Sequence, residues 1–319
     1  MVPAICLVCQ TKLEFPEDQA GSWQRCAYCR APLKVPTRGS GSLPAISAPA
    51  GTGVSPIPGR LKQMANEMRR REEMETGLKT ARARQLHMLP SLPMVPGIEF
   101  HAVYSPATNL SGDFYDFIPV REGLIGISLG DVSGHGIEAG ILMGMVKKAI
   151  QIHAKGRTSA AETLIIANKD LARDLGGETF FSASYGLLDT QHRVFRFARA
   201  GHSPAIVVNP DRDPALMEIK PNGMVIGPDR TGKRFAAVLK EQDLPLQQGD
   251  LVFQYTDGLT EAPDRERIEF GEDRVRDLLL KHGRSNIRDA VGAIEDAVYA
   301  HIGPSDQEDD ITMVAFKVL

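Results

Sequence analysis

Residues 124–136 read Leu-Ile-Gly-Ile-Ser-Leu-Gly-Asp-Val-Ser-Gly-His-Gly, so an apolar run is followed directly by a glycine-rich turn. The apolar residues up to Leu129 predict a buried strand, and the glycines after it predict a sharp change of direction. Asp131 therefore stands at the end of the strand. Beyond the turn, apolar residues recur at helical spacing from Ile137 to about His153. The stretch predicts a strand, a turn that carries a carboxylate, and a helix.

The rest of the region 90–319 continues in the same mixed character. Alternating apolar residues predict further strands at 98–104, 114–120, 179–188, 193–200, 205–209, 234–240, 250–256 and 311–318. Helical spacing predicts a second helix after Ser159 and two more before the final strand, the last of them over 287–302. Because the strands come in runs and the helices in pairs, we expect an α+β fold built on an antiparallel β-sandwich flanked by helices, and not a βαβ repeat.

A set of aspartates lies at the predicted strand ends, next to glycine or to each other. Its members are Asp113, Asp131, Asp257, Asp309 and Asp310. Each one alone has a plain alternative reading, because Asp-Gly and Ser-Gly are common turn sequences. Together, carboxylates projecting from neighbouring buried strands would repel each other unless a cation lay between them. Ligands that are all oxygen favour Mg²⁺ or Mn²⁺.

The four cysteines of the chain all lie within its first 29 residues. Cys6 with Cys9 and Cys26 with Cys29 form two C-x-x-C pairs, a spacing that predicts one structural Zn²⁺ held by four thiolates. The alternative is a pair of disulfides, which a reducing compartment disfavours. Residues 1–36 are thus expected to form a zinc ribbon, with small hairpins between Lys12 and Val35.

Two segments of opposite composition follow. Residues 37–59 are mostly Gly, Pro, Ser, Ala and Thr, which predicts a flexible linker. Residues 60–89 carry eight basic and four acidic residues and predict one long helix. Its broken apolar stripe fits either a coiled coil, and so a homodimer through this helix, or a solvated helix lying on its own domain.

The composition excludes several classes of protein. The net charge of −3 gives no strong signal for nucleic-acid binding. No apolar run reaches the ~18 residues of a membrane span, and no export leader is seen, so we expect a cytoplasmic protein without membrane contact. A dinucleotide fingerprint, a P-loop, a nucleophile elbow and a zincin motif are all missing.

The order of the remaining motifs is more specific. The motifs are Ser-Gly-Asp-Phe-Tyr-Asp-Phe at 111–117, Gly-Asp-Val-Ser-Gly-His-Gly at 130–136, Ala-Gly-His-Ser-Pro at 200–204, Gln-Tyr-Thr-Asp-Gly-Leu-Thr-Glu-Ala at 254–262 and Asp-Asp-Ile-Thr at 309–312. In this order and spacing they resemble the metal-dependent serine/threonine phosphatases of the PPM type, in the SpoIIE/RsbU branch of bacterial regulators. The resemblance covers 86–319. It implies an α-β-β-α fold for residues 90–319.

The resemblance also implies roles for individual residues. Asp131 would bridge two Mn²⁺ or Mg²⁺ ions, and the main-chain carbonyl of Val132 would be a further ligand. Asp257 and Asp309 match the remaining ligands of one ion, while Asp113 matches an acidic residue that binds directly or through the metal's waters. Asp131 and Asp113 are therefore the expected catalytic carboxylates. Asp310 is expected to contact the metal ligands without binding the metal itself.

Two histidines lie in these motifs. His135 follows the Asp131 turn and is the candidate that would give a proton to the leaving seryl oxygen, although a histidine between glycines also fits a plain loop residue. His202 is expected to be structural.

The implied activity is hydrolysis of phosphoserine or phosphothreonine by a water that two metal ions activate. The substrate implied by the family is a small phosphorylated regulatory protein, of the STAS type that antagonises anti-sigma factors. The alternative from another class is a catalytically silent adaptor that assembles partners through the zinc ribbon and the helix.

Overall fold

The computed structural model of the chain describes residues 1–5, 12–26, 32–35, 58–134, 136–175 and 179–319. The described residues form two compact units, Met1–Gly77 and Leu78–Leu319. In neither unit is a described helix both long enough and apolar enough to cross a bilayer.

The first unit contains two small antiparallel hairpins. β1 (Val2–Ile5) pairs with β2 (Lys12–Phe15), and β3 (Trp23–Arg25) pairs with β4 (Pro32–Lys34). Buried Ala4, Cys26 and Leu33 pack together as the small core of these hairpins. Cys6, Cys9 and Cys29 lie outside the described residues. The long helix α1 (Pro58–His87) begins in this unit, where residues 60–89 predicted it, and ends in the second.

The second unit is built on two antiparallel sheets. One sheet has the strand order β11-β10-β13-β14-β5, with β5 (Ile98–Ser105), β10 (Ala205–Val208), β11 (Leu216–Ile219), β13 (Leu251–Tyr255) and β14 (Ile311–Val318). The other has the order β12-β9-β8-β7-β6, with β6 (Phe114–Arg121), β7 (Leu124–Val132), β8 (Phe181–Asp189), β9 (Val194–Ala200) and β12 (Glu241–Pro245). The antiparallel α+β prediction is confirmed.

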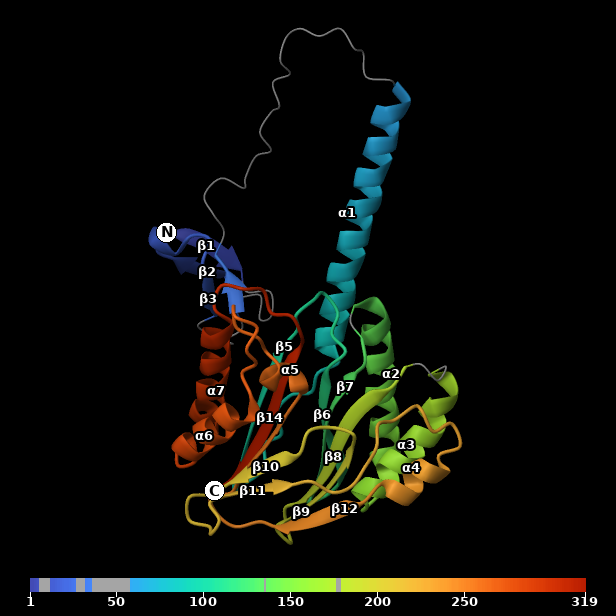
Figure 1. Cartoon of the computed structure of the whole chain (residues 1–319), viewed down its shortest axis with the longest axis vertical. Coiled ribbons are helices and arrows are strands. Elements are labelled where there is room, and N and C mark those ends of the chain that lie inside the picture. The colour runs from blue at the N-terminus through green and yellow to red at the C-terminus, as the bar shows by residue number, and fades with distance from the viewer. Residues whose placement is uncertain (6–11, 27–31, 36–57, 135, 176–178) are drawn as a thin grey trace. The chain divides into compact units, whose positions relative to one another are not determined.

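Helices cover the outer face of each sheet (Figure 1). α2 (Ile137–Ala154) and α3 (Ala160–Asp174) pack on β6 to β9, while α6 (Glu272–His282) and α7 (Ile287–Ile302) pack on the sheet that holds β14. Buried apolar side chains fill the space between the two sheets and both spaces between a sheet and its helices. The unit therefore has four layers, in the order α-β-β-α.

One predicted strand is wrong. Residues 234–240 were expected to extend, but the chain forms the short helix α4 (Lys233–Val238). The main-chain N–H of Phe235 donates to a carboxylate oxygen of Asp229 at 2.9 Å, and the Phe235 ring is buried in the core beneath α3. The sequence of this segment is compatible with a strand and with a short helix, because either can bury the single large ring of Phe235. The strands β11 and β12 were not predicted.

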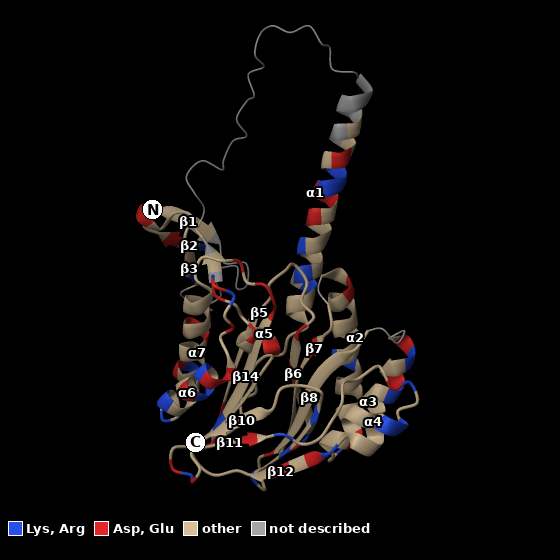
Figure 2. Ribbon diagram, in the orientation of Figure 1, with Lys and Arg blue, Asp and Glu red and all other residues tan. Residues whose placement is uncertain are grey.

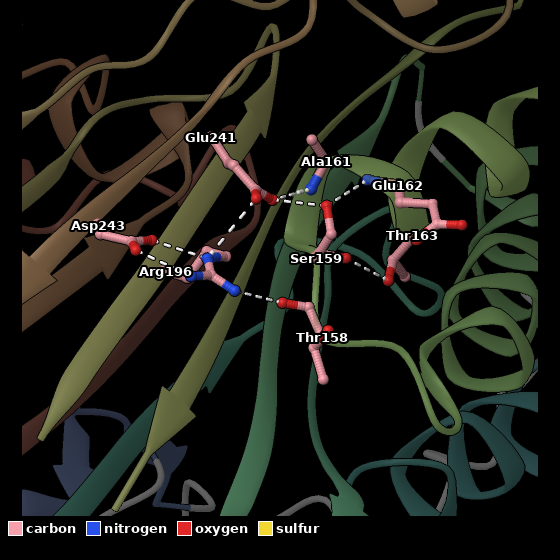
Figure 3. Close-up of polar contacts among 8 residues, drawn as sticks. All are labelled: Thr158, Ser159, Ala161, Glu162, Thr163, Arg196, Glu241 and Asp243. Carbon is pink, nitrogen blue, oxygen red and sulfur yellow. Dashed lines mark hydrogen bonds and ion pairs between the residues drawn. The ribbon is translucent and has the colours of Figure 1, made fainter. Parts of the chain in front are cut away.

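The edge strand β12 is held by polar contacts with the start of α3 (Figure 3). Glu241 accepts hydrogen bonds from the main-chain N–H of Ala161 at 2.9 Å and from the Ser159 hydroxyl at 2.8 Å. On the neighbouring strand β9, the Arg196 guanidinium donates to both carboxylate oxygens of Asp243, at 2.7 and 2.8 Å. Because a helix N-terminus carries partial positive charge, the carboxylate of Glu241 stabilises α3 there.

Candidate metal centre

The carboxylates predicted at strand ends gather at one end of the sandwich. In the second sheet β6 pairs with β7, so that Phe114 lies opposite Gly130 and the residues Asp113 and Asp131 share that end. In the first sheet β13 pairs with β14, with Tyr255 opposite Met313. Asp257 follows β13, and Asp309 and Asp310 precede β14, so these three residues lie at the same end of the sandwich. Two sheets thus supply carboxylates to one place.

Asp113 is held between the two sheets. Its Oδ2 atom accepts hydrogen bonds from the hydroxyls of Thr256, at 2.8 Å, and Thr312, at 2.6 Å. Burial raises the pKa of Asp113 well above its usual range, and the negative charges of Asp131 and Asp310 raise it further. The two threonine hydroxyls oppose this shift, since a hydrogen bond to a carboxylate favours its charged form.

The carboxyl group of Asp131 also has a raised pKa. Burial raises its pKa to about 8, and the charges of Asp257, Asp309 and Asp310 add to the shift, while a hydrogen bond from Asp113 opposes it. The cluster therefore cannot hold all its negative charges at neutral pH without a compensating cation. A divalent cation would offset both the burial and the repulsion that raise this pKa.

Asp257 begins the short helix α5 (Asp257–Thr260), directly after β13. Its pKa is raised by burial and by the charge of Asp309. The next residue, Gly258, lies so close to the turn before β14 that an added Cβ would be 2.0 Å from the Asp310 carbonyl oxygen. α5 and this turn are thus in direct contact, and acidic residues are prominent around α5 (Figure 2).

The side chain of Asp310 is turned toward the main chain of another loop. Its two carboxylate oxygens accept hydrogen bonds from the N–H groups of Ala107, at 2.7 Å, and Gly112, at 3.0 Å. Both oxygens are therefore engaged in holding the loop that leads to Asp113. That Asp310 supports the metal ligands without binding the metal itself stays a prediction.

Gly112 is a point of close approach between the loop and β7. A Cβ at this position would lie 2.7 Å from the carbonyl oxygen of Val132 and 3.2 Å from Oδ1 of Asp131. The absence of a side chain therefore leaves room beside the two oxygens that the resemblance assigns to metal. A carboxylate and carbonyl donor set of this kind fits a hard cation such as Mg²⁺ or Mn²⁺.

The carboxylates are neighbours without forming a ready-made cage. Within the described ranges, no three His, Cys, Asp or Glu side chains converge closely enough to hold an ion as they stand. The charges of Asp257, Asp309 and Asp310 nevertheless raise the pKa of Asp131, as expected of carboxylates that lie near one another. Small side-chain movements would be needed to surround an ion.

A buried glutamine that the sequence analysis did not single out also holds this region. The Gln85 amide, near the end of α1, accepts from the Ser111 N–H at 3.0 Å and donates to the Ser111 carbonyl at 2.8 Å. An added Cβ on Gly140 of α2 would lie 3.3 Å from Nε2 of Gln85. α1, α2 and the loop before Asp113 therefore meet at one buried amide.

Of the two histidines in the motifs, the structure describes only His202. His135 lies outside the described residues, although its neighbours Gly134 and Gly136 have positive φ values of 96° and 83°, as a glycine turn requires. His202 is buried, and its Nδ1 lies 2.7 Å from the hydroxyl of Ser182 on β8.

Comparisons with known proteins agree with this architecture. The family model for stage II sporulation protein E matches residues 121–319. The protein IcfG of Synechocystis is 26% identical over 276 residues, which are 77% of this chain but 41% of IcfG, so this chain spans less than half of that relative. The phosphoserine phosphatase RsbU of Bacillus subtilis is 25% identical over 242 residues, covering 74% of this chain and 68% of RsbU.

Among solved structures, the PP2C domain of SiaA from Pseudomonas aeruginosa superposes with a TM-score of 0.66. The match covers 77% of this chain and 98% of the SiaA domain, with 23% sequence identity. At this identity the likeness establishes the fold, which is the four-layered sandwich described above.

Proposed function

Since the chain belongs to the SpoIIE family and carries a phosphatase domain of the PP2C type, we propose that it removes phosphate from serine or threonine side chains with the help of two divalent cations. The observation that carries this proposal is the gathering of Asp113, Asp131 and Asp257 at one end of the sandwich, where burial and the neighbouring carboxylates raise the pKa of Asp131 to about 8. Buried carboxylates arranged to repel one another are typical of a site that binds cations.

Each carboxylate has a proposed place in this centre. The carboxylate of Asp131 and the carbonyl of Val132, which approach each other beside Gly112, would help to hold the cations. Asp257, Asp309 and Asp113 would be further ligands, with Asp113 acting directly or through bound water. The cations supply Lewis-acid chemistry, which lowers the pKa of a water and neutralises phosphate charge.

The protein's own groups hold this arrangement in place. Thr256 and Thr312 fix one oxygen of Asp113 through their hydroxyls, and the Asp113 side chain also hydrogen-bonds Asp131. Asp310 fixes the main chain of the same loop through Gly112. His135 remains the proposed proton donor to the leaving oxygen, because it directly follows the turn after Asp131.

The activity is tested with p-nitrophenyl phosphate and a phosphoserine peptide, each assayed with Mn²⁺, with Mg²⁺ and with EDTA. We expect turnover that depends on the cation and that Asp131→Asn or Asp257→Asn abolishes. Asp277→Asn is the matched control, since Asp277 is exposed on α6. Cation-independent turnover, or none on either substrate, would count against the phosphatase and favour the adaptor.

The proposed substrate is a small phosphorylated regulatory protein of the STAS type that antagonises an anti-sigma factor. The support for this class is the similarity to RsbU, which is named as a phosphoserine phosphatase. We expect the chain to dephosphorylate such a protein faster than it does a peptide carrying the same phosphoserine, because surface contacts add binding energy. Equal rates on the protein and the peptide would contradict this choice of substrate.

The N-terminal cysteines are proposed to hold one structural Zn²⁺ through Cys6, Cys9, Cys26 and Cys29. The support is their spacing, together with the burial of Cys26 among the hairpins. Elemental analysis of the purified chain should give one zinc per chain, and Cys26→Ser should lower this content. A zinc-free chain with oxidised cysteines would favour the disulfides.

The helix over residues 60–89 is proposed to pair two chains. Met68 and Met74 are large apolar side chains that are exposed on α1, by 63% and 64%, which supports a partner on this helix. Sedimentation of the full chain should give a dimer that Met68→Lys weakens. A monomer at micromolar concentration would instead favour a solvated helix.

A further inference from the structure

Polar side chains join the two sheets directly beneath the candidate metal centre. Ser182 on β8 pairs in register with Asp131 on β7, so their side chains lie on the same face of the sheet. Ser184, two residues further along, shares this face, and its hydroxyl donates to the side-chain oxygen of Gln254 on β13 at 2.9 Å. This face is therefore directed toward the opposite sheet. The contact between the sheets is polar next to Asp131, whereas it is apolar in the middle of the sandwich.

His202 lies in this polar layer and has no part in the proposed chemistry. It is 4% exposed, and its Nδ1 lies 2.7 Å from the Ser182 hydroxyl. The main chain of Tyr255, at the end of β13 and two residues before Asp257, also lies near the ring. Nε2 of His202 is buried and has no hydrogen-bond partner among the described residues.

The electrostatic surroundings keep this ring neutral. Burial lowers the pKa of His202 to about 3, the charge of Arg199 lowers it further, and the main chain of Tyr255 opposes the shift. Arg199 also donates to the His202 carbonyl at 2.6 Å, which fixes the main chain of the histidine. A neutral imidazole has one N–H and one acceptor nitrogen, so it can accept from Ser182 while it directs its N–H toward Tyr255.

We infer that His202 is a positioning residue that sets the spacing between Asp131 and Asp257, because it links β8, which pairs with the strand of Asp131, to the end of β13, which precedes Asp257. The ring contacts Ser182, the residue opposite Asp131, and lies near the main chain of Tyr255, two residues before Asp257. Metal ligands must be placed within a few tenths of an ångström, so a rigid ring between the two sheets is a suitable spacer. This inference rests on the proposed function, because it assigns both carboxylates to one centre.

Three substitutions separate the two contacts of the ring. In His202→Asn the amide takes the place of Nδ1 and keeps the contact with Ser182, whereas in His202→Gln the longer amide reaches toward Tyr255. His202→Ala removes both contacts. Val208→Ala is the matched control, because Val208 is fully buried at the opposite end of the sheet, where it pairs with Leu251.

The measurements are Tm, Mn²⁺ binding by calorimetry, and the Mn²⁺ dependence of turnover of the full chain. We expect His202→Ala to weaken Mn²⁺ binding by about 10- to 100-fold, as is typical when a residue that orients metal ligands is lost. Turnover at saturating Mn²⁺ should largely recover, and Asn and Gln should each restore part of the affinity. Val208→Ala should lower Tm and leave Mn²⁺ binding unchanged.

Two outcomes would overturn this inference, and they differ. A His202→Ala chain that loses Tm like Val208→Ala but binds Mn²⁺ with wild-type affinity would show that the ring only fills space, and the phosphatase proposal would stand. A wild-type chain without Mn²⁺ binding or cation-dependent turnover would refute the proposed function, and with it the role of His202.

Discussion

The hydroxyl of Thr312, on β14, donates a 2.6 Å hydrogen bond to Oδ2 of Asp113, which precedes β6 in the opposite sheet. Thr256 donates to the same oxygen at 2.8 Å, so one carboxylate oxygen of Asp113 is tied to the other half of the sandwich. The Asp113 side chain also hydrogen-bonds Asp131. Asp113 is thus both a contact between the sheets and a candidate contributor to the metal centre.

Removing the Thr312 hydroxyl should therefore weaken the centre. Thr312→Val keeps the volume but removes a hydrogen bond to a buried charged group, for which a cost of about 1.5–3 kcal/mol is typical. We expect cation-dependent turnover to fall about tenfold or more, and Thr312→Ser to recover most of it. Steady-state kinetics at several Mn²⁺ concentrations checks this; wild-type kinetics in Thr312→Val would show that the bond does not position Asp113.

Gly112 should tolerate no side chain. Gly112→Ala places a Cβ 2.7 Å from the Val132 carbonyl oxygen, so the loop or the end of β7 must move. We expect calorimetry to show that Mn²⁺ binding is lost, and we expect the Tm to fall. Gly77→Ala is the control, because nothing lies within 4 Å of its added Cβ and alanine favours a helix by about 0.5–1 kcal/mol. Normal Mn²⁺ binding in Gly112→Ala would argue against a metal centre at this position.

The pH dependence of stability should have an unusual sign. With cations removed by EDTA, folded Asp131 keeps its proton up to about pH 8, whereas the unfolded chain loses it near pH 4. The folded chain binds more protons between these values, so its stability should fall as pH rises from about 5 to 8. Asp113, whose pKa is also raised, acts in the same direction.

Thermal unfolding at several pH values measures this effect. Asp131→Asn should flatten the fall in Tm, and saturating Mn²⁺ should reverse it, because cation binding requires deprotonated carboxylates and so strengthens with pH. A Tm that rises from pH 5 to 8 in EDTA would show that these carboxylates are not destabilised by one another.

The carboxylate at the start of α3 should contribute to stability without affecting turnover. Glu241→Ala removes the acceptor for the Ala161 N–H and the Ser159 hydroxyl, and a loss of about 1 kcal/mol is expected in urea unfolding. Asp211→Ala is the control, since its ion pair with Arg284 is exposed on both sides and should contribute little. Equal unfolding midpoints for the two variants would show that the contact with Glu241 is not stabilising.

The sequence predicts most of the core elements because their burial leaves a periodic apolar pattern. β7 and α2 agree closely with the pattern around Asp131, and so does α7. β12 escaped prediction because it lies at the edge of its sheet and carries Glu241, Gln242 and Asp243 in succession. α4 was taken for a strand because one buried ring, Phe235, gives no period that separates the two structures.

The site was predictable in part for a similar reason. Aspartates at strand ends next to glycine are visible in the sequence, and the structure brings Asp113, Asp131 and Asp257 to one end of the sandwich. The groups that hold them are not visible in this way, because Thr312 and Gln85 act on loops far away along the chain. The coordinating roles, the zinc site and the role of His135 remain predictions.

The most direct test of the central claim is release of phosphate from a phosphoserine peptide, measured with titrated Mn²⁺ for the wild type, Asp131→Asn and Asp277→Asn. The account predicts turnover that rises with Mn²⁺ in the wild type and in Asp277→Asn, and that is lost in Asp131→Asn. Turnover in Asp131→Asn equal to the wild type at every Mn²⁺ concentration would contradict it.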